Sequence, residues 1–306
     1  MQDGSRKAII AAFGANLGIA VAKFVGFAIT GSAGLLAEAA HSVADTGNQG
    51  LLLLGTKRAK RPATDDHPFG FGRERYFWAF VVALVLFSMG GLFALYEGVD
   101  KLRHPHATAH AAVAFVIIGI AIALETFSLR TAMREANHVR PPSTSWWQYI
   151  KTSKQPELPI VLLEDLGAEL GLAFALVGLI LAEVTHNPRF DAAGSLAIGV
   201  LLVVVAAVLA IEMKGLLIGE AAAPHEQDAV RAALARSPHV RRVIHLRTQH
   251  LGPDELLVAA KLEFAPDVTV AELAGQIDET EAIVRAALPS AKVMYIEPDI
   301  HREPYE

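Results

Sequence analysis

Charged side chains within an otherwise apolar helical stretch constrain this chain more than any other feature. The segment Gly34-Leu-Leu-Ala-Glu-Ala-Ala-His-Ser-Val-Ala-Asp-Thr-Gly-Asn-Gln49 continues into Leu51-Leu-Leu-Leu54 and is predicted to be a helix that enters a bilayer. It nevertheless contains Glu38, His41 and Asp45, and a charged residue at the middle of a membrane costs about 2.5–3.5 kcal/mol. A membrane helix that keeps three such residues is expected to use them.

The spacing of these residues favours a metal site. His41 and Asp45 are four residues apart and therefore project from one face of a helix, with Glu38 on the same side. One neutral imidazole and one carboxylate, one turn apart, supply half of a tetrahedral site for a divalent cation. The alternative is that His41 and Asp45 bond each other and stiffen a helix bundle. We favour the cation site because Asn48 and Gln49 extend the polar face further than such a bundle needs.

The same stretch resembles a known family. Residues 23–45, Lys23-Phe-Val-Gly-Phe-Ala-Ile-Thr-Gly-Ser-Ala-Gly-Leu-Leu-Ala-Glu-Ala-Ala-His-Ser-Val-Ala-Asp45, are similar to the first two helices of the cation diffusion facilitator family, the zinc transporters. In that family a His or Asp, and the Asp one turn later, bind the transported metal. The resemblance therefore implies that role for His41 and Asp45.

Composition indicates a membrane protein. Of the 306 residues, 53% are hydrophobic and only 19% are charged, and the mean hydropathy is +0.37. The chain has no cysteine, so disulfides and thiolate zinc sites are excluded and any metal must bind through His, Asp and Glu. A net charge of −5 gives no reason to expect nucleic acid as a partner. The first apolar run is longer than a signal-peptide core and is expected to stay in place.

Six segments are predicted to cross a hydrocarbon core of about 30 Å, which takes about 20 helical residues. They run approximately over residues 8–30, 33–56, 77–96, 110–130, 158–183 and 191–213. Lys and Arg concentrate between the second and third segments and between the fourth and fifth. By the positive-inside rule, both termini and these two loops face the cytoplasm. Six spans fit that alternation and five do not.

The fifth segment holds a second acidic group, Leu163-Glu-Asp-Leu-Gly-Ala-Glu-Leu-Gly171. Buried like charges repel, so a cation or protons must neutralise them. The resemblance aligns Asp165 with a metal-binding Asp of the family, whereas Val161 stands where the family usually has a further His or Asp. Helix periodicity favours Glu169 as the missing ligand, and the depth of the family's ligand favours Glu164. Water is the third choice.

Glu125 and Lys23 are also charged residues inside predicted spans. Glu125 is deep enough in the fourth segment to need a partner, and Lys23 is one candidate. Lys23 can also extend its long side chain toward the membrane interface.

Two accessory metal sites of the family are expected to be weak in this chain. The loop Asp65-Asp-His-Pro-Phe-Gly-Phe-Gly-Arg-Glu-Arg75 resembles a family loop that has a second His where this chain has Phe71. A structural turn around His67 is therefore favoured over a ligand cluster. Tyr295 likewise stands where relatives commonly have His.

The composition becomes soluble in character after Lys214, which predicts two domains, residues 1–214 and 215–306. The second reads as an αββαβ sequence, with Thr269 as the N-cap of its second helix. The predicted elements are a helix over 225–236, strands over 240–250 and 255–264, a helix over 268–288 and a strand over 292–297. This order resembles the family's ferredoxin-like cytoplasmic domain, which dimerises.

Taken over the whole chain, the resemblance implies a six-helix antiporter of the inner (plasma) membrane. It would export Zn²⁺ in exchange for protons, as a homodimer in the lipid bilayer, without a cofactor and without enzymatic activity. Co²⁺ and Fe²⁺ suit the same ligands, and Mn²⁺ prefers an all-oxygen site. An intramembrane metallohydrolase is disfavoured because the His-Glu-x-x-His spacing is absent from the sequence. A metal sensor that does not transport is the other alternative.

Overall fold

A computed structural model of the chain describes residues 3–105 and 110–302, with the backbone alone for residues 3–16. The chain divides into two compact units. One contains residues 1–56 and 77–213, and the other contains residues 57–76 and 214–306.

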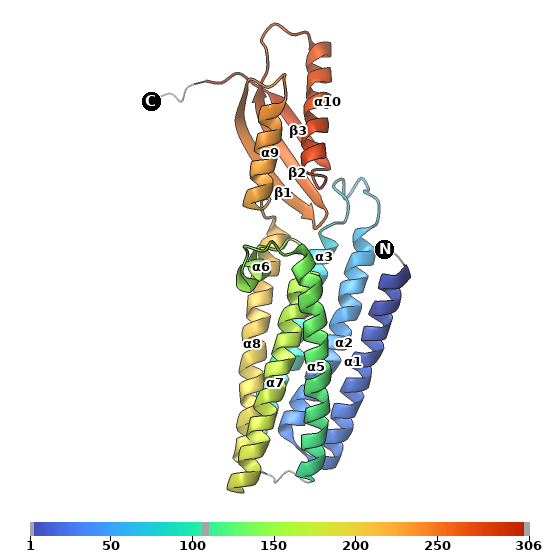
Figure 1. The fold of residues 1–306 in the computed structure, drawn as a ribbon, viewed down its shortest axis with the longest axis vertical. Coiled ribbons are helices and arrows are strands. Elements are labelled where there is room, and N and C mark those ends of the chain that lie inside the picture. The colour runs from blue at the N-terminus through green and yellow to red at the C-terminus, as the bar shows by residue number, and fades with distance from the viewer. Residues whose placement is uncertain (1–2, 106–109, 303–306) are drawn as a thin grey trace. The chain divides into compact units, whose positions relative to one another are not determined.

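The first unit is a bundle of long helices that run side by side (Figure 1). Its elements are α1 (Asp3–Thr30), α2 (Ala33–Ala59), α3 (Glu74–Val85), the π-helix η1 (Leu86–Leu92), α4 (Phe93–Arg103), α5 (Ala111–Val139), the short α6 (Trp146–Thr152), α7 (Glu157–Thr185) and α8 (Arg189–Ile218). Each predicted span lies within one of these helices, or within the continuous run of α3, η1 and α4, to within one residue. That run, Glu74–Arg103, is longer than predicted at both ends.

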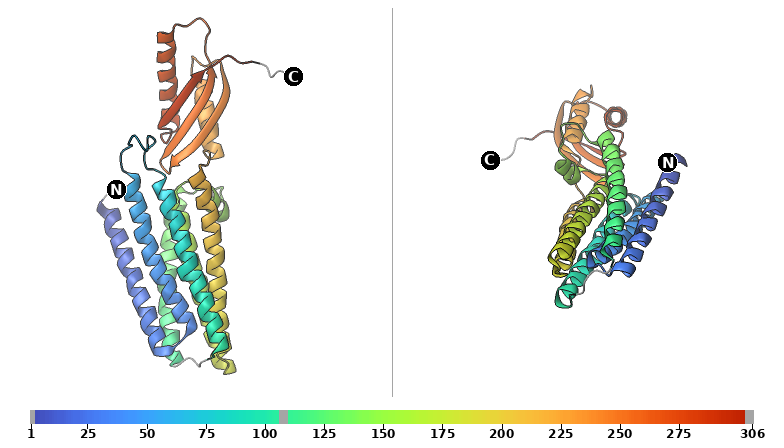
Figure 2. Two further views of the ribbon diagram at one scale, coloured as in Figure 1. Left: turned by 180° about the vertical axis from the view of Figure 1, so that it is seen from behind. Right: turned by 60° about the horizontal axis from the view of Figure 1, so that its bottom comes forward.

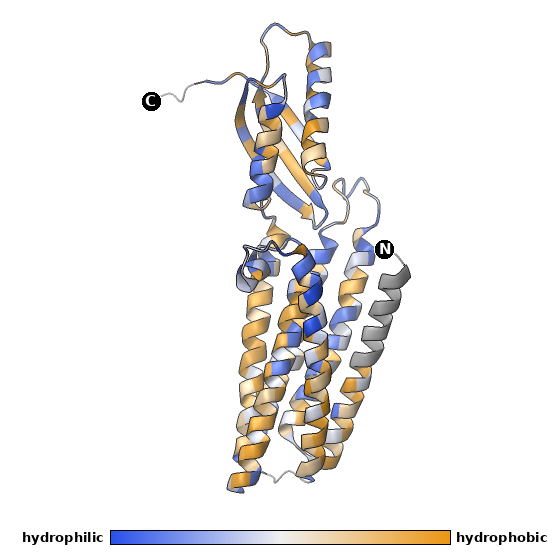
Figure 3. Cartoon of the chain, viewed as in Figure 1, coloured by the Kyte–Doolittle hydropathy of each residue, from blue (hydrophilic) through white to orange (hydrophobic). Residues whose placement is uncertain are grey.

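Four stretches of helix in the described part of the chain are long and apolar enough to cross a membrane. They are Glu74–Arg103, Ala111–Val139, Glu157–Thr185 and Arg189–Ile218. In α1 the described apolar stretch is Leu17–Thr30. Figure 3 shows hydrophobic residues predominating along these helices. The chain is therefore a multi-pass membrane protein, and the count of six spans remains a prediction because the polar residues of α2 lower its hydropathy.

Small residues allow the helices of the bundle to approach closely. A Cβ at Gly199 of α8 would lie 2.7 Å from Leu95 Cγ of α4, so these two backbones are almost in contact. On the other side of the bundle, α5 packs against α1 and α7. The two views of Figure 2 show these helices from behind and from one end. Inside the bundle, α2 buries most of its polar face.

Asp191 joins the start of α8 to the start of α2. Its carboxylate accepts hydrogen bonds from Ser32 Oγ at 3.0 Å and from the backbone N–H of Ala33 at 3.1 Å. Lys101 of α4 lies 3.7 Å from the same carboxylate and donates to the carbonyl of Gly31. The first N–H groups of α2, which have no partner within the helix, are thus capped by a residue from a distant helix.

The paired tryptophans Trp146 and Trp147 lie near lysines in the sequence, which predicts a short element at the membrane interface, and they form the short helix α6. Ser145 caps it by accepting a hydrogen bond from the backbone N–H of Gln148 at 3.2 Å. The guanidinium of Arg140 lies 4.4 Å from the centre of the Trp146 ring, and Lys151 Nζ lies 5.3 Å from that of Trp147. Its position at a membrane interface remains a prediction.

The second unit has the predicted αββαβ order, which confirms the ferredoxin-like class. Its elements are α9 (Pro224–Arg236), β1 (Arg242–Gly252), β2 (Glu255–Glu263), α10 (Val270–Ala287) and β3 (Val293–Pro298). The sheet order is β1-β2-β3, with β1 antiparallel and β3 parallel to β2. Thr269 is the N-cap of α10, and it exchanges hydrogen bonds with Glu272 in a capping box.

The two faces of this sheet differ. Buried and half-buried residues alternate along β2, so every second side chain enters an apolar core shared with α9 and α10. The opposite face carries polar and aromatic residues in two cross-strand rows. One row is Arg247, Ala259 and Tyr295, and the other is His245, Lys261 and Glu297.

Residues 57–76 belong to the second unit. Arg75 Nη1 lies 2.8 Å from Asp254 Oδ2, in the turn between β1 and β2. The segment is the structural turn that the sequence predicts. The ring centroids of His67 and Phe71 are 4.5 Å apart, and the guanidinium of Arg61 lies 3.9 Å from the centre of the Phe71 ring.

Candidate metal centre

His41 and Asp45 face each other inside the bundle, one turn apart on α2. His41 is fully buried, and its Nε2 lies 3.5 Å from Asp45 Oδ2. That separation is too long for a good hydrogen bond. Because zinc lies about 2.0–2.2 Å from nitrogen and oxygen ligands, two ligands of a tetrahedral ion are about 3.3–3.5 Å apart. The two atoms are therefore spaced as neighbouring ligands of one small divalent cation.

Buried polar atoms without a hydrogen-bond partner cluster on this face of α2. They are Glu38 Oε1, both ring nitrogens of His41, Asp45 Oδ1, Asn48 Oδ1 and Gln49 Oε1. Leaving a buried donor or acceptor unsatisfied costs about 1–3 kcal/mol for each group. A helix that concentrates such atoms over three turns is suited to binding a ligand that satisfies them.

A small cavity lies between α2 and α7. Its lining consists of Ile19, Ser42, Asp45, Gln49, Glu125, Val161, Glu164 and Asp165. The centre of a water-sized sphere can occupy about 10 Å³ of it, which is room for about one water molecule. One ion without its hydration shell fits this space, and carboxylates from α2, α5 and α7 surround it.

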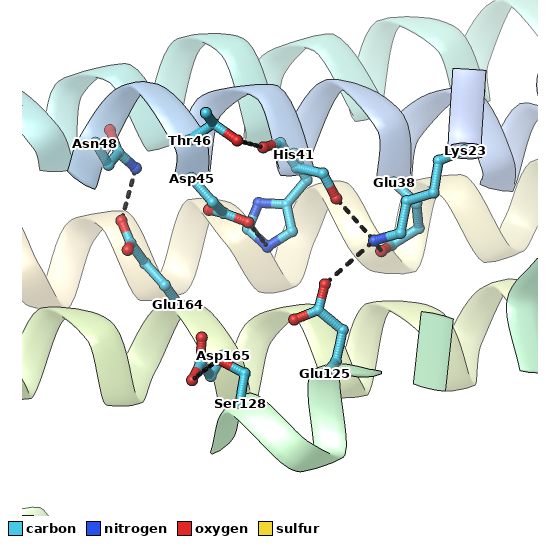
Figure 4. Close-up of polar contacts among 11 residues, drawn as sticks. Lys23, Glu38, His41, Asp45, Thr46, Asn48, Glu125, Ser128, Glu164 and Asp165 are labelled. Atoms are coloured by element: carbon cyan, nitrogen blue, oxygen red, sulfur yellow. Dashed lines mark hydrogen bonds and ion pairs between the residues drawn. The ribbon is translucent and has the colours of Figure 1, made fainter. Parts of the chain in front are cut away.

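The three acids of α7 are held by different neighbours, and Figure 4 shows those of Glu164 and Asp165. Glu164 Oε1 accepts a hydrogen bond of 2.6 Å from Asn48 Nδ2, and Asp165 Oδ2 accepts one of 3.0 Å from Ser128 Oγ. Both acids line the cavity. Glu169 does not line the cavity.

Glu169 instead bonds to α5, where its Oε1 accepts from Thr126 Oγ1 at 2.9 Å. The structure thus places Glu164 and Asp165 with Asp45 around one cavity and leaves Glu169 to one side. Among the described residues, no three His, Asp or Glu side chains converge closely enough to hold an ion. The hydrogen bond from Asn48 ties Glu164 to α2, and that from Ser128 ties Asp165 to α5.

Sequence reasoning missed the residues that position these acids. Asn48 is one turn beyond Asp45 on α2, and its position on the polar face was a usable signal, although its partner Glu164 was not predictable. Ser128 is a single hydroxyl in an apolar run of α5 and gave no such signal. Gly90 of η1 is a third case, because a Cβ there would lie 3.8 Å from His41 Nδ1. Its missing side chain leaves room beside the imidazole.

Lys23 does not extend toward an interface, so that prediction is wrong. Its side chain is fully buried, and its ammonium lies 3.2 Å from Glu38 Oε2 and 3.5 Å from Glu125 Oε1. The predicted pairing of Lys23 with Glu125 is confirmed. Lys23 stays inside because two buried carboxylates would otherwise lack a counter-charge. Glu38, which shares a helix side with His41, is turned to the lysine.

Comparison with known protein families shows to which family the chain belongs. Residues 9–218 match the family model of the cation efflux transmembrane domain. The chain belongs to the cation efflux family. Residues 222–305 match the model of the cation efflux protein, cytoplasmic domain. Members of the cation efflux family, also called cation diffusion facilitators, are transporters and not enzymes, which removes the intramembrane hydrolase from consideration.

Curated members of the cation efflux family are similar over most of this chain. The human protein "Proton-coupled zinc antiporter SLC30A9, mitochondrial" (Homo sapiens) is 32% identical over 243 residues, which are 79% of this chain and 43% of that protein. "Metal tolerance protein C4" of Arabidopsis thaliana is 28% identical over 267 residues, 87% of this chain and 58% of that protein. This chain thus spans less than two thirds of the length of either relative.

A solved structure is similar to a part of this cation efflux protein. MamM-CTD 215-293 is 22% identical and covers 25% of this chain and 96% of its own, with a TM-score of 0.24. The full-length "Magnetosome protein MamM" of Paramagnetospirillum magneticum is 26% identical over 236 residues, 76% of this chain and 68% of that protein.

Proposed function

We propose that this protein moves divalent metal cations across a membrane, and that its main substrate is Zn²⁺, exported in exchange for protons. The observation that carries the proposal is the buried pair of His41 and Asp45, whose facing atoms are spaced as ligands of one ion, beside a cavity that Asp45 lines and that has room for one ion. Membership of a transporter family supports it, as does similarity to a protein described as a proton-coupled zinc antiporter.

The proposed ligands are His41, Asp45 and Asp165, with Glu164 as the fourth. Glu164 is preferred to Glu169 because it lines the cavity. Glu169 is assigned a role in carrying protons. A set of one imidazole and three carboxylates suits Zn²⁺, Co²⁺ and Fe²⁺, and replacing the imidazole by oxygen would favour Mn²⁺.

Coupling to protons follows from the same ligands. Metal binding requires a neutral imidazole and ionised carboxylates, so protons and metal compete for one site. A bundle that rocks between two open states would load metal on the side with fewer protons and release it on the other. The separation of the α2 and α7 ligands supports this scheme, since a bound ion would draw the two helices together.

The remaining assignments concern topology and assembly. We propose that the protein lies in the inner (plasma) membrane, which it crosses six times, with both termini in the cytoplasm. Residues 1–214 would form the transport domain. Residues 215–306 would form a homodimer through the face of the sheet that α9 and α10 do not cover. Because Tyr295 and Phe71 replace family histidines, this domain should dimerise without metal and bind Zn²⁺ weakly. Calorimetry and sedimentation of the isolated domain test both statements.

The experiment that tests transport is a metal-by-metal flux assay in reconstituted vesicles with a pH gradient. Zn²⁺ should move against the proton flow, and collapse of the gradient should stop its accumulation. Metal flux that does not depend on the pH gradient would contradict antiport, but the protein would still be a metal transporter. Binding of Zn²⁺ without any flux would instead identify a metal sensor.

A further inference from the structure

A second polar cluster lies beside the metal cavity, centred on Lys23. Its ammonium donates to Ser42 Oγ at 2.8 Å and to Glu38 Oε2 at 3.2 Å, and it lies 3.5 Å from Glu125 Oε1. These partners come from α2 and α5, and Figure 4 shows Lys23 between the two carboxylates. Lys23 and Glu38 are fully buried, and Glu125 is 7% exposed.

The surroundings of the ammonium are those of a site for a hard cation. Two carboxylate oxygens and one hydroxyl oxygen converge on a single point, and this all-oxygen set is the kind that Ca²⁺, Mg²⁺ and Mn²⁺ prefer. The two carboxylates together carry one more negative charge than the ammonium neutralises. Glu38 Oε1 is buried and has no hydrogen-bond partner, so the acceptor capacity of the cluster exceeds what Lys23 supplies.

The position of Glu38 is fixed by the neighbouring helix. A Cβ at Gly171 of α7 would collide with Glu38 Oε1. The carboxylate therefore lies directly against the α7 backbone, where only glycine leaves room. Three helices thus hold Lys23, Glu38 and Glu125. Gly171 of a fourth helix, α7, leaves room for the Glu38 carboxylate.

The cluster and the metal cavity share two wall residues. Ser42 and Glu125 line the cavity together with Asp45, Glu164 and Asp165, and both also contact the Lys23 ammonium. A free cation in place of the ammonium would lie next to the ion in the cavity. The two ions would then share the same wall and repel each other.

We infer that Lys23 is a tethered cation. It occupies a second cation site made by Glu38, Ser42 and Glu125, and it thereby restricts the bundle to one divalent ion, the one in the cavity. The identity of that ion rests on the proposed function. The second site itself does not, because its residues are separate from His41, Asp45, Glu164 and Asp165.

The test counts bound Mn²⁺ on the full-length protein in detergent. Free Mn²⁺ is measured by electron paramagnetic resonance after equilibration, for the wild type and for Lys23→Met, which keeps the length of the side chain and removes its charge. Lys23→Met should bind one Mn²⁺ per protomer more than the wild type. Lys23→Met combined with Glu125→Gln should return to the wild-type number. An unchanged number in Lys23→Met overturns the inference.

Lys101→Met is the matched control. Lys101 is also a lysine near a buried carboxylate, that of Asp191, but both oxygens of this carboxylate accept hydrogen bonds, from Ser32 and Ala33. This variant should bind no additional ion. A gain equal to that of Lys23→Met would mean that any lost lysine admits Mn²⁺, and would count against a built site.

The test also holds if Lys23→Met is unstable. The inference then requires Mn²⁺ to replace the ammonium and to raise the unfolding temperature of Lys23→Met more than that of the wild type. A variant that unfolds or aggregates at every Mn²⁺ concentration overturns it. The proposed function fails if a parallel Zn²⁺ titration of the wild type detects no bound ion, whereas a gain of one Mn²⁺ in Lys23→Met would still establish the second site.

Discussion

The two units of the molecule bury polar groups in opposite ways. In the αββαβ unit the core is apolar, Ser237 Oγ and Thr280 Oγ1 pair at 2.8 Å, and the unpartnered buried atoms among the described residues are scattered over His250, Gln276 and Ser290. In the bundle the interior holds Lys23, Glu38, His41, Glu125 and Glu164 among its buried residues. Six of the unpartnered buried atoms in the described chain lie on α2 between residues 38 and 49.

The difference follows from the solvent of each unit. In water, apolar burial stabilises a fold at roughly 25 cal/mol per Å², so the αββαβ unit gains by keeping its interior apolar. Between membrane helices this gain is absent because lipid tails are as apolar as leucine, and association depends on packing and polar contacts. Exposed apolar side chains of the bundle, such as Val184 at 74% and Phe127 at 73%, fit that environment. Unsatisfied atoms in such an interior stabilise nothing and are best explained by a ligand.

The largest expected effect is that of Asp45→Ala. If the unpartnered acceptors of the bundle serve transport and not stability, this variant should lose metal flux to the background of empty vesicles without a lower unfolding temperature. Asp100→Ala, which removes a surface carboxylate of α4, is the control and should transport normally. Undiminished flux in Asp45→Ala would show that Asp45 of α2 takes no part in transport. The contrast between a bundle whose buried polar groups serve transport and an αββαβ unit whose polar groups serve stability would then fail.

Glu164→Gln and Glu169→Gln form a matched pair for the next effect. At high pH, where protons do not compete, Glu164→Gln should weaken Zn²⁺ binding by an order of magnitude or more. Glu169→Gln should keep the affinity and change its pH dependence, because Glu169 is bonded to Thr126 outside the cavity. Equal affinities of both variants and the wild type would leave three protein ligands and a water.

These residues also show how far sequence alone reaches. The closeness of His41 and Asp45 was predictable because both residues lie on one helix, where spacing fixes the face. On α7, helix periodicity favoured Glu169, but the choice depends on which neighbour each acid meets, and Asn48 and Thr126 come from other helices. The αββαβ unit was predictable to within a few residues, since alternation along β2 and the cap at Thr269 are local signals. No local sequence signal predicts the contact between residues 57–76 and the turn at Asp254.

His41→Asp is expected to have a moderate effect on selectivity. In the wild type, apparent Zn²⁺ affinity should fall as the pH drops, because protons and metal compete for the imidazole and the carboxylates. The all-oxygen variant should have a different pH profile and should accept Mn²⁺ more readily. Flux titrations with both metals measure this. Identical pH profiles and metal preference in the two proteins would show that His41 is not a ligand.

The smallest expected effect tests the other side of the comparison, a polar pair that serves stability. His250 is buried in the αββαβ unit, and its Nε2 lies 3.6 Å from Glu226 Oε2. This imidazole, with the backbone N–H of Ala223 that donates to the same carboxylate at 2.9 Å, lowers the pKa of Glu226 below its ordinary value. The carboxylate also lies in the first turn of α9, where the helix dipole favours negative charge.

A lowered pKa means that the folded domain prefers the ionised form, so the stabilisation is complete above the unfolded pKa of about 4.3. It is lost as the pH falls through the lower, folded value. Glu226→Gln should therefore lower the free energy of unfolding of residues 215–306 by about 1 kcal/mol at pH 7, and the difference should vanish in acid. Urea titrations between pH 3 and 7 measure it. Glu281→Gln, which breaks a surface pair with Arg285, is the control and should cost only a few tenths of a kcal/mol. A pH-independent loss in Glu226→Gln would mean that the side chain acts through packing and not through its charge.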